Sequence, residues 1–319
     1  MSSPPPPSPP GRSWRVAAPL AALAYPGLVW LVPHVSPVCL VAAIAAPLIG
    51  LAAAVRLGRT VAFPIARGVA YFAVTAPPLF SFLGGWLDFQ HMIPVGSLGV
   101  WLVLWALLVI AVLFERERTA PSPPAPSQRR LAVAHGVSAI VIIVFSIAHL
   151  INHLSGLAGG ATHEGVMRSL RIVYRHPVIE PVLAAALVFQ VVSGLWLVRR
   201  KCARALSSLD TLQVASGTYL AMFLASHVSA VLRTRYLYGA DTNWTWLAGG
   251  ELLTDPWSAR LVPYYFLAVI ALGLHAASGL RTVLIGHGVS AARSAVAVAV
   301  IGSGAMIVSS AIMVALFRA

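Results

Sequence analysis

The sequence predicts an all-α fold, a polytopic membrane helix bundle with about nine spans. Of its 319 residues, 59% are hydrophobic and only 10% are charged, and the mean hydropathy is +0.84. This composition is typical of a membrane protein and excludes an ordinary soluble domain. The apolar segments do not alternate as outer-membrane strands do. We therefore expect helices, which satisfy their backbone hydrogen bonds internally.

Nine apolar segments approach the roughly twenty residues that a helix needs to cross a bilayer core. The third segment is the least regular, because Pro77 and Pro78 interrupt it and Gly84 and Gly85 end it. The first is expected to be a retained anchor, since Pro26 breaks its apolar run and no signal-peptide cleavage pattern follows. In order, the segments cover residues 16–33, 37–55, 68–86, 95–114, 133–157, 178–198, 212–232, 261–280 and 294–317.

The net charge of +13 invites a nucleic-acid interpretation, but the basic residues lie in short loops and form no single patch. Their distribution predicts topology instead, with the N-terminus cytoplasmic and the C-terminus outside, in a membrane that we expect to be the bacterial inner membrane. Fifteen of the 22 Lys and Arg residues then lie on the inner side: Arg12, Arg15, Arg56, Arg59, Arg67, Arg116, Arg118, Arg129, Arg130, Arg199, Arg200, Lys201, Arg204, Arg281 and Arg293.

Changes in composition divide the chain into four parts. Residues 1–15 form a Pro-rich leader that is expected to be disordered, and residues 115–130 form a Pro/Ser linker. Between them, residues 16–114 form a four-span N-terminal unit. Residues 131–319 form a five-span unit in which FSIAHL resembles FLASHV and FQVVSGL resembles LHAASGL, so it predicts a pair of related hairpins. The N-terminal unit is expected to be a degenerate copy of the same hairpin.

His149 and His227 each lie within an apolar span, where an ionisable side chain is costly and usually marks a function. His227 precedes Arg233 by six residues, about 9 Å along a helix, and His149 lies in the outer half of its own span. Both imidazoles are therefore expected at one outer level of the membrane. Two imidazoles at matched depth are suited to the axial positions of a b-type haem iron. The alternative is that both residues only pack.

A second, inner level is expected to contain His275 and Gln190. His275 precedes Arg281 by six residues, about 9 Å, and Gln190 precedes Arg199 by nine residues, about 13 Å. Glutamine is a poor ligand for haem iron, so this pair predicts no bis-histidine site. His275 is expected to hydrogen-bond Gln190 or to ligate a five-coordinate haem.

Other candidate residues are weaker. His153 lies one turn after His149 and is the main alternative ligand or a partner for a haem propionate. His163 and His176 are expected in a solvated basic outer loop, and His135 is interpreted as a boundary residue. The outer loop with Trp244, Trp246 and Trp257 is expected to lie in the aromatic belt; a lid over the outer level is the alternative.

The five-span unit resembles the transmembrane cytochrome b subunit of succinate dehydrogenase and fumarate reductase. The similar elements are RRL…HG, FSIAHL, QVVSGL, SGTYLAMFLASH and LHAASGLR. The resemblance implies that His149 and His227 hold one haem and that His275 is a ligand of a second. Gln190 stands where the other ligand of that second haem would be, which argues against an ordinary dehydrogenase anchor.

A more specific likeness is to the transmembrane domain of the fungal mitochondrial adapter linked to lipid homeostasis. VYRHPVIEPVLAAALVFQVVSGLWLVRR and SGTYLAMFLASHVSAVLRTR are similar to its segments, and a polar YRHPVIEP is not dictated by membrane insertion. This resemblance implies an adapter or lipid-linked role.

Two functions follow as hypotheses. One is a membrane protein that binds one haem b between His149 and His227 and exchanges electrons with a quinone or a redox partner subunit. The other is a haem-free scaffold or adapter for lipid homeostasis. We expect no active site of its own, because the chain has no nucleophile–base motif, phosphate loop or non-haem metal motif. The expected partners are the lipid bilayer and proteins, with no nucleic acid.

Overall fold

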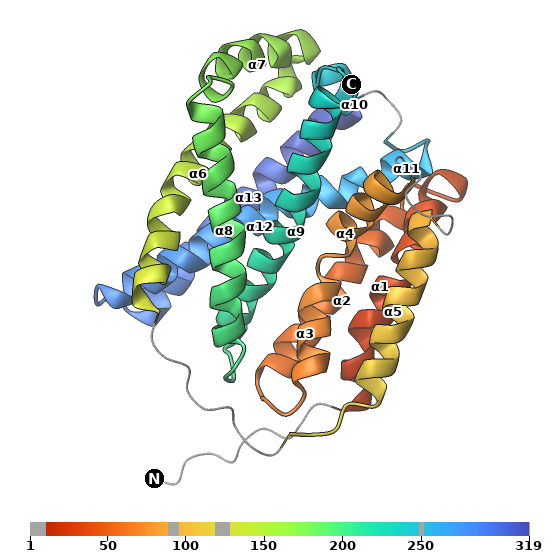
Figure 1. Cartoon of the computed structure of the whole chain (residues 1–319), viewed down its shortest axis with the longest axis vertical. Coiled ribbons are helices and arrows are strands. Elements are labelled where there is room, and N and C mark those ends of the chain that lie inside the picture. Colours follow the sequence, from red (N-terminus) through yellow and green to blue (C-terminus); the bar gives the residue numbers. More distant parts are fainter. Residues whose placement is uncertain (1–10, 89–95, 119–127, 249–251, 319) are drawn as a thin grey trace.

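A computed structural model describes residues 11–88, 96–118, 128–248 and 252–318. Residues 1–10 of the predicted disordered leader (1–15), the start of the fourth span at Val95 and most of the linker lie outside these residues. The described chain folds into an elongated helix bundle (Figure 1). Its long helices are α1 (Arg12–His34), α2 (Cys39–Gly58), α5 (Gly96–Leu113), α6 (Arg129–Ser155), α8 (Ile179–Lys201), α9 (Ser208–Tyr236), α12 (Leu261–Gly286) and α13 (Ala291–Phe317).

Shorter helices complete the bundle. These are α3 (Pro64–Ala73), α4 (Ala76–Leu83), a π-helical turn η1 (Gly84–Asp88), a 3₁₀ turn η2 (Gly156–Ala158), α7 (Gly160–Tyr174), α10 (Trp244–Ala248) and α11 (Pro256–Ala259). The described residues contain no strand, so the all-α prediction is confirmed.

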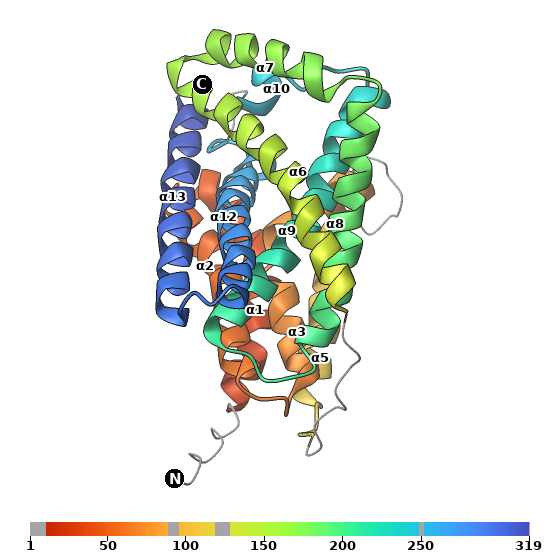
Figure 2. The ribbon, with the colours of Figure 1, turned by 90° about the vertical axis from the view of Figure 1, so that its left-hand side faces the viewer.

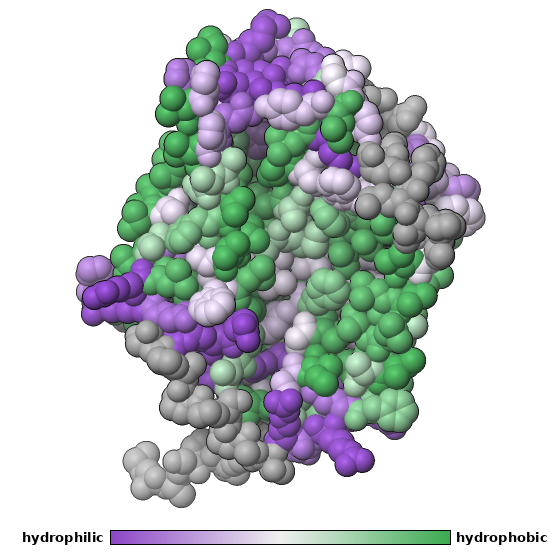
Figure 3. All heavy atoms as spheres, in the orientation of Figure 1, coloured by the Kyte–Doolittle hydropathy of each residue, from purple (hydrophilic) through white to green (hydrophobic). Residues whose placement is uncertain are grey.

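Among the described residues, eight helices are long and apolar enough to cross a membrane. The helix α3 and the segment Ala76–Asp88 pass the same test only together and bend by 70° at their junction, so the number of spans reaches the predicted nine if this bent pair counts as one span. The bend lies just before Pro77 and Pro78. Neither proline has an N–H to donate to the preceding turn, which is why a continuous helix ends there. Figure 3 shows the corresponding apolar band along the helices, with hydrophilic surface at both ends of the face in view.

The loops that carry most of the basic residues gather at one end of the bundle, at the bottom of Figure 1. The Leu206 backbone N–H donates to the Gly58 carbonyl at 2.7 Å, and the Arg67 guanidinium donates to the Arg204 carbonyl at 2.9 Å. The predicted alternation of the spans is therefore present. That this end faces the cytoplasm remains the prediction from charge.

The N-terminal unit has a tightly packed core. Tyr25, Trp101 and Trp105 are fully buried, and the Trp101 indole N–H donates to the Ala22 carbonyl at 3.0 Å. Many of the surrounding buried residues are alanines of α1, α2 and α3, which let the helix backbones approach closely. This unit packs against α9 and α12, so the N-terminal and C-terminal units share one core.

The helices α6 and α8 form a more peripheral pair on the other side of α9 and α12. At its outer end α8 is anchored by an ion pair between Glu180 and Arg235 of α9 at 2.5 Å. Lys201 and Asp210 form a second ion pair at its inner end, at 3.0 Å. Glu180 belongs to the YRHPVIEP segment, so helix anchoring accounts for part of its polar character.

The segment expected as a solvated outer loop is instead the helix α7, which lies across the outer end of the bundle (Figure 2). Its inward face includes His163 and Met167, which are 2% and 5% exposed, and Trp244 of α10 packs beneath it. The predicted belt position of Trp244 is wrong, because this side chain is buried under α7. Trp246 is 41% exposed, as a belt residue would be.

Two helix boundaries differ from expectation. The first helix begins at Arg12, so residues 12–15 are helical and do not belong to the leader. At the start of the predicted linker, the Glu115 carboxylate accepts the backbone N–H groups of Ile65 and Ala66 at 2.6 and 2.8 Å. Glu115 therefore caps the otherwise unsatisfied N-terminus of α3.

The helices α12 and α13 pack closely at Gly273, and a substitution there tests this contact. A Cβ added to Gly273 would lie 2.4 Å from the Ala305 Cβ, whereas one added to Gly279 of the same helix meets nothing within 4 Å. We expect Gly273→Ala to destabilise the protein by about 1–3 kcal/mol through overpacking. Gly279→Ala, the control, is expected to be neutral or to gain up to about 1 kcal/mol from helix propensity. Thermal unfolding in detergent followed by tryptophan fluorescence measures both, and equal midpoints would contradict this packing.

Candidate functional site

His149 of α6 and His227 of α9 lie together, as their matched depth predicted. Their ring centroids are 6.2 Å apart, and their planes make an angle of 65°. We call these two residues the outer pair. Each imidazole stacks on the phenylalanine one turn before it in its own helix, Phe145 at 5.5 Å and Phe223 at 5.2 Å. The repeated F-x-x-x-H pattern thus sets the orientation of both rings.

His153 also belongs to the outer level, as expected from its place one turn after His149. The Nε2 atoms of His149 and His153 are 3.2 Å apart and form a hydrogen bond. Only one of the two nitrogens can carry the shared proton, so the other is the acceptor. This bond uses the nitrogen through which His149 would bind a metal. For His149 to bind a metal through Nε2, its hydrogen bond to His153 must break and be replaced by the bond to the metal.

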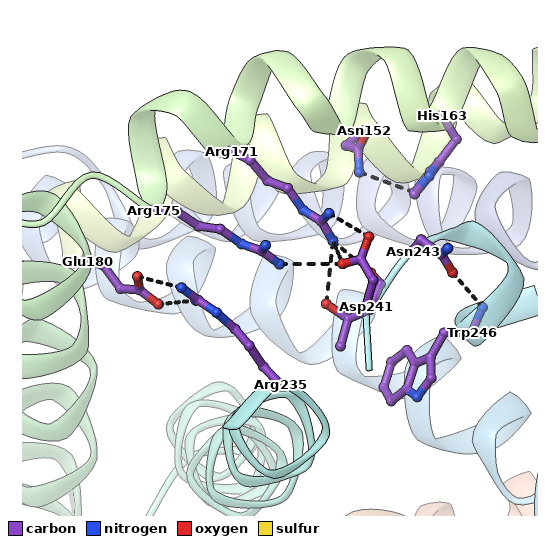
Figure 4. Close-up of polar contacts among 10 residues, drawn as sticks. Asn152, His163, Arg171, Arg175, Glu180, Arg235, Asp241, Asn243 and Trp246 are labelled. Atoms are coloured by element: carbon purple, nitrogen blue, oxygen red, sulfur yellow. Dashed lines mark hydrogen bonds and ion pairs between the residues drawn. The ribbon is translucent and has the colours of Figure 1, made fainter. Parts of the chain in front are cut away.

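His163 extends the outer cluster toward the surface, and the sequence analysis missed it. Its ring centroid lies 5.4 Å from that of His153 and 4.6 Å from that of Trp244. The Asn152 amide donates to His163 Nε2 at 3.1 Å, as Figure 4 shows. Burial lowers the pKa of His163, the nearby Glu164 carboxylate opposes this shift, and the Arg171 guanidinium adds to it. His163 is therefore a neutral imidazole at neutral pH.

At the inner level the structure corrects the expected partnership of His275 with Gln190. The ring beside His275 is His135 of α6, with centroids 6.4 Å apart and planes at 83°. We call His135 and His275 the inner pair. Gln190 instead turns toward α6, where its amide donates to the His135 carbonyl at 2.7 Å and to the Ser138 hydroxyl at 2.6 Å. Gln190 therefore joins two helices and is not placed as a ligand.

Hydrogen bonds define the tautomer of each imidazole in the inner pair. The buried Ser193 hydroxyl donates its only proton to the Phe189 carbonyl at 2.5 Å, so it accepts from His135 Nδ1 at 2.7 Å. His275 Nδ1 lies 3.1 Å from the Gln213 carbonyl oxygen, which can only accept. Both Nδ1 atoms therefore carry the proton, and both Nε2 atoms present a lone pair. A metal ligand requires this arrangement.

Glycines make room beside the inner pair. A Cβ on Gly217 of α9 would lie 2.7 Å from a ring carbon of His275, and a Cβ on Gly194 of α8 would lie 3.3 Å from a ring carbon of His135. Larger residues at these positions would push the rings out of place. The backbone of α9 therefore limits where the His275 ring can lie, and the backbone of α8 limits where the His135 ring can lie.

One helix contributes to both pairs. His135 and His149 are fourteen positions apart in α6, which is close to four helical turns and about 21 Å along the axis. They consequently project from nearly the same face of α6 at two depths. This spacing is visible in the sequence and could have identified His135, which its closeness to Arg129 and Arg130 led us to interpret as a boundary residue.

A groove of about 230 Å³ opens between α6, α12 and α13. On α6 it spans Ile143 to Leu150, a stretch that reaches the height of His149, and its α12 side includes Leu272 and Gly273. The lining is apolar apart from Ser146. α6 therefore leaves a lateral opening that hydrocarbon can enter.

Within the described ranges, no group of three or more His, Cys, Asp or Glu side chains is arranged to hold a metal ion. The histidines instead form the outer pair and the inner pair, each with one imidazole from each of two helices. Two protein ligands suit a metal whose remaining positions are filled by a cofactor, as in a bis-histidine haem.

Comparison of the chain with family models, with curated proteins and with solved structures gives no match. The resemblance to the succinate dehydrogenase cytochromes and to the fungal adapter therefore stays a prediction that rests on the motifs quoted above. The function proposed below is inferred from the geometry of the two histidine pairs.

Proposed function

We propose that this integral membrane protein binds haem b and acts as an electron carrier. The observation that supports it is the presence of two imidazole pairs, at two depths, between α6 and the helices that face it. The outer pair is the haem site expected from the sequence. The inner pair adds a second site, with His135 in the place expected for Gln190.

The separation of the rings agrees with this proposal. With metal–nitrogen bonds of about 2 Å, two imidazoles on opposite sides of one metal have ring centres about 6 Å apart. The observed separations are 6.2 Å in the outer pair and 6.4 Å in the inner pair. The ring separation in both pairs is therefore compatible with a metal bound between the two imidazoles.

The chemistry of the donors favours the inner pair. Its Nδ1 atoms are engaged by Ser193 and by the Gln213 carbonyl, and its Nε2 atoms are available to a metal. In the outer pair, binding through His149 Nε2 competes with the hydrogen bond to His153. We therefore expect the inner pair to bind more tightly.

Bound at such a pair, a haem b supplies a one-electron carrier whose potential depends on ligands and burial. The protein's own contribution is to hold the imidazoles in one tautomer, to stack Phe145 and Phe223 on the outer rings and to surround them with apolar helices. The electron donor and acceptor, which we expect to include a quinone or a partner subunit, belong to the same proposal.

A second candidate function is the haem-free scaffold or adapter for lipid homeostasis. The observation that favours it is the apolar groove between α6, α12 and α13, whose lining suits a hydrocarbon chain. In that case the hydrogen bonds of His149, His135 and Gln190 would serve only to join helices. The two functions differ in whether the protein carries haem.

The first prediction of this proposal concerns the absorption spectrum. Protein produced with haem supply and purified in detergent should show a sharp low-spin α-band in the reduced-minus-oxidised difference spectrum. We expect His275→Ala and His135→Ala to remove one component of this band, and His149→Ala and His227→Ala to remove the other. His287→Ala is the control, because this residue is exposed at the end of α12. A flat spectrum from folded wild-type protein would reject haem binding and leave the scaffold function.

A second prediction concerns Ser193. Replacing it with alanine removes the acceptor that holds His135 Nδ1, and such partners typically contribute 10- to 100-fold to metal affinity. Haem titration of the haem-free protein should therefore show affinity at the inner pair weakened by about 10- to 100-fold in Ser193→Ala. Ser169→Ala, on the exposed side of α7, is the matched control and should bind as the wild type does. Equal affinity in both variants would contradict the proposed role of Ser193.

A further inference from the structure

A pocket outside the histidine site opens at the outer end of α9, where this helix meets the π-helical turn η1 of the N-terminal unit. Its volume is about 310 Å³. The residues that line it come from η1 and from the end of α9, and they are Trp86, Ser229, Leu232, Arg233, Tyr236 and Leu237. These side chains are mostly apolar or aromatic, and Arg233 is the charged group among them.

The Arg233 guanidinium is held in this pocket by groups that do not neutralise its charge. Its Nη1 donates to the Gly85 carbonyl, its Nε donates to the Ser229 carbonyl at 3.4 Å, and its Cζ lies 4.7 Å from the centre of the Trp86 ring. Gly85 makes this close approach possible, since a Cβ there would lie 2.5 Å from Nη2 of Arg233. Within the described ranges Nη2 itself forms no hydrogen bond, so it is free to donate to a ligand.

Arg233 lacks an acidic partner, unlike two other arginines at this end of the bundle. Arg235 is paired with Glu180 at 2.5 Å, and Arg171 is paired with Asp241 at 2.9 Å (Figure 4). In the part of the chain that the structure describes, no carboxylate forms an ion pair with Arg233. A half-buried charge among apolar groups is costly when no opposite charge lies beside it. The pocket is therefore suited to an anion.

The depth of the pocket indicates which kind of anion it meets. Arg233 lies three residues before the end of α9, which is about 4.5 Å along the helix. Tyr236 and Leu237 are each 64% exposed. Aromatic rings at the ends of membrane spans lie at the depth of the lipid headgroups. A ligand in this pocket therefore meets a guanidinium at headgroup depth, with apolar surface directly beside it.

We propose that this pocket binds an anionic phospholipid, whose phosphate contacts Arg233 and whose acyl chain begins along Leu232 and Leu237. A guanidinium presents several N–H donors to phosphate oxygens, and Nη2 is the one that the protein leaves unused. An anionic headgroup is favoured over a zwitterionic one, because the lining has no acidic side chain to receive an ammonium group. The bound lipid would contact both η1 and α9 and so join the N-terminal and C-terminal units. This site does not depend on haem binding.

The test is native mass spectrometry of the full chain in detergent, titrated with palmitoyl-oleoyl phosphatidylglycerol. The fraction of protein that retains one lipid gives the affinity of the tightest binding step. We expect Arg233→Gln to weaken this step by about tenfold or more, because the substitution removes a charge-assisted hydrogen bond. Arg168→Gln is the matched control, since Arg168 is exposed on α7 and does not line the pocket. It should bind the lipid as the wild type does.

A second variant keeps the test decisive if Arg233→Gln does not fold. Leu237→Asp changes an exposed residue and places a carboxylate that competes with phosphate for Arg233, so it should weaken lipid binding in the same way. Equal affinity in the wild type and these folded variants would overturn the proposal. Equal affinity of the wild type for phosphatidylcholine would also overturn it, as would displacement of the lipid by millimolar inorganic phosphate, which would indicate a site for a free anion. None of these outcomes changes the haem difference spectrum that tests the proposed function.

Discussion

Polar side chains in a bilayer must find their partners within the protein, because hydrocarbon offers none. This constraint organises the C-terminal unit. α6 places His135, Ser138, His149, Asn152 and His153 along one span, and each of these side chains meets a polar atom of α6, α7 or α8. The peripheral α6–α8 pair is therefore held by hydrogen bonds, whereas the N-terminal unit is held by alanine and aromatic packing. The site lies where the bundle depends most on polar contacts.

Much of the fold could be predicted because the bilayer sets it. Segment length and hydropathy predicted nine spans, and the spacing of arginines predicted which loops share an end of the bundle. Depth also predicted that His149 and His227 meet. Depth does not reveal the direction in which a side chain points, however. Gln190 has the height expected for a partner of His275, but the rotation of α8 directs it toward α6. That rotation depends on packing between helices, which the hydropathy of a single span does not show.

Two residues of the site, His135 and His163, were missed because basic residues lie close to both of them in the sequence. His135 lies close to the basic residues that begin α6, so its position suggested a boundary, although its spacing of fourteen from His149 placed both on one face. His163 lies among arginines, which suggested a solvated loop. The segment is an amphipathic helix whose inward face carries the buried His163 and Met167 and the half-buried Leu170 and Tyr174, at the three- and four-residue spacing of a helix. In both cases the neighbouring basic residues drew attention away from the helical spacing of the site residue and the other side chains on its face.

The central claim is that the two imidazole pairs are haem ligands, and the most direct measurement is the haem content of the purified chain. Protein produced with haem supply is converted to its pyridine haemochrome, and the haem is counted against protein determined by amino-acid analysis. The account predicts two haem groups per chain, falling to one in His275→Ala and to one in His227→Ala. A wild-type value near zero in folded protein would contradict it, and the histidines would then be residues that join helices around a groove for lipid.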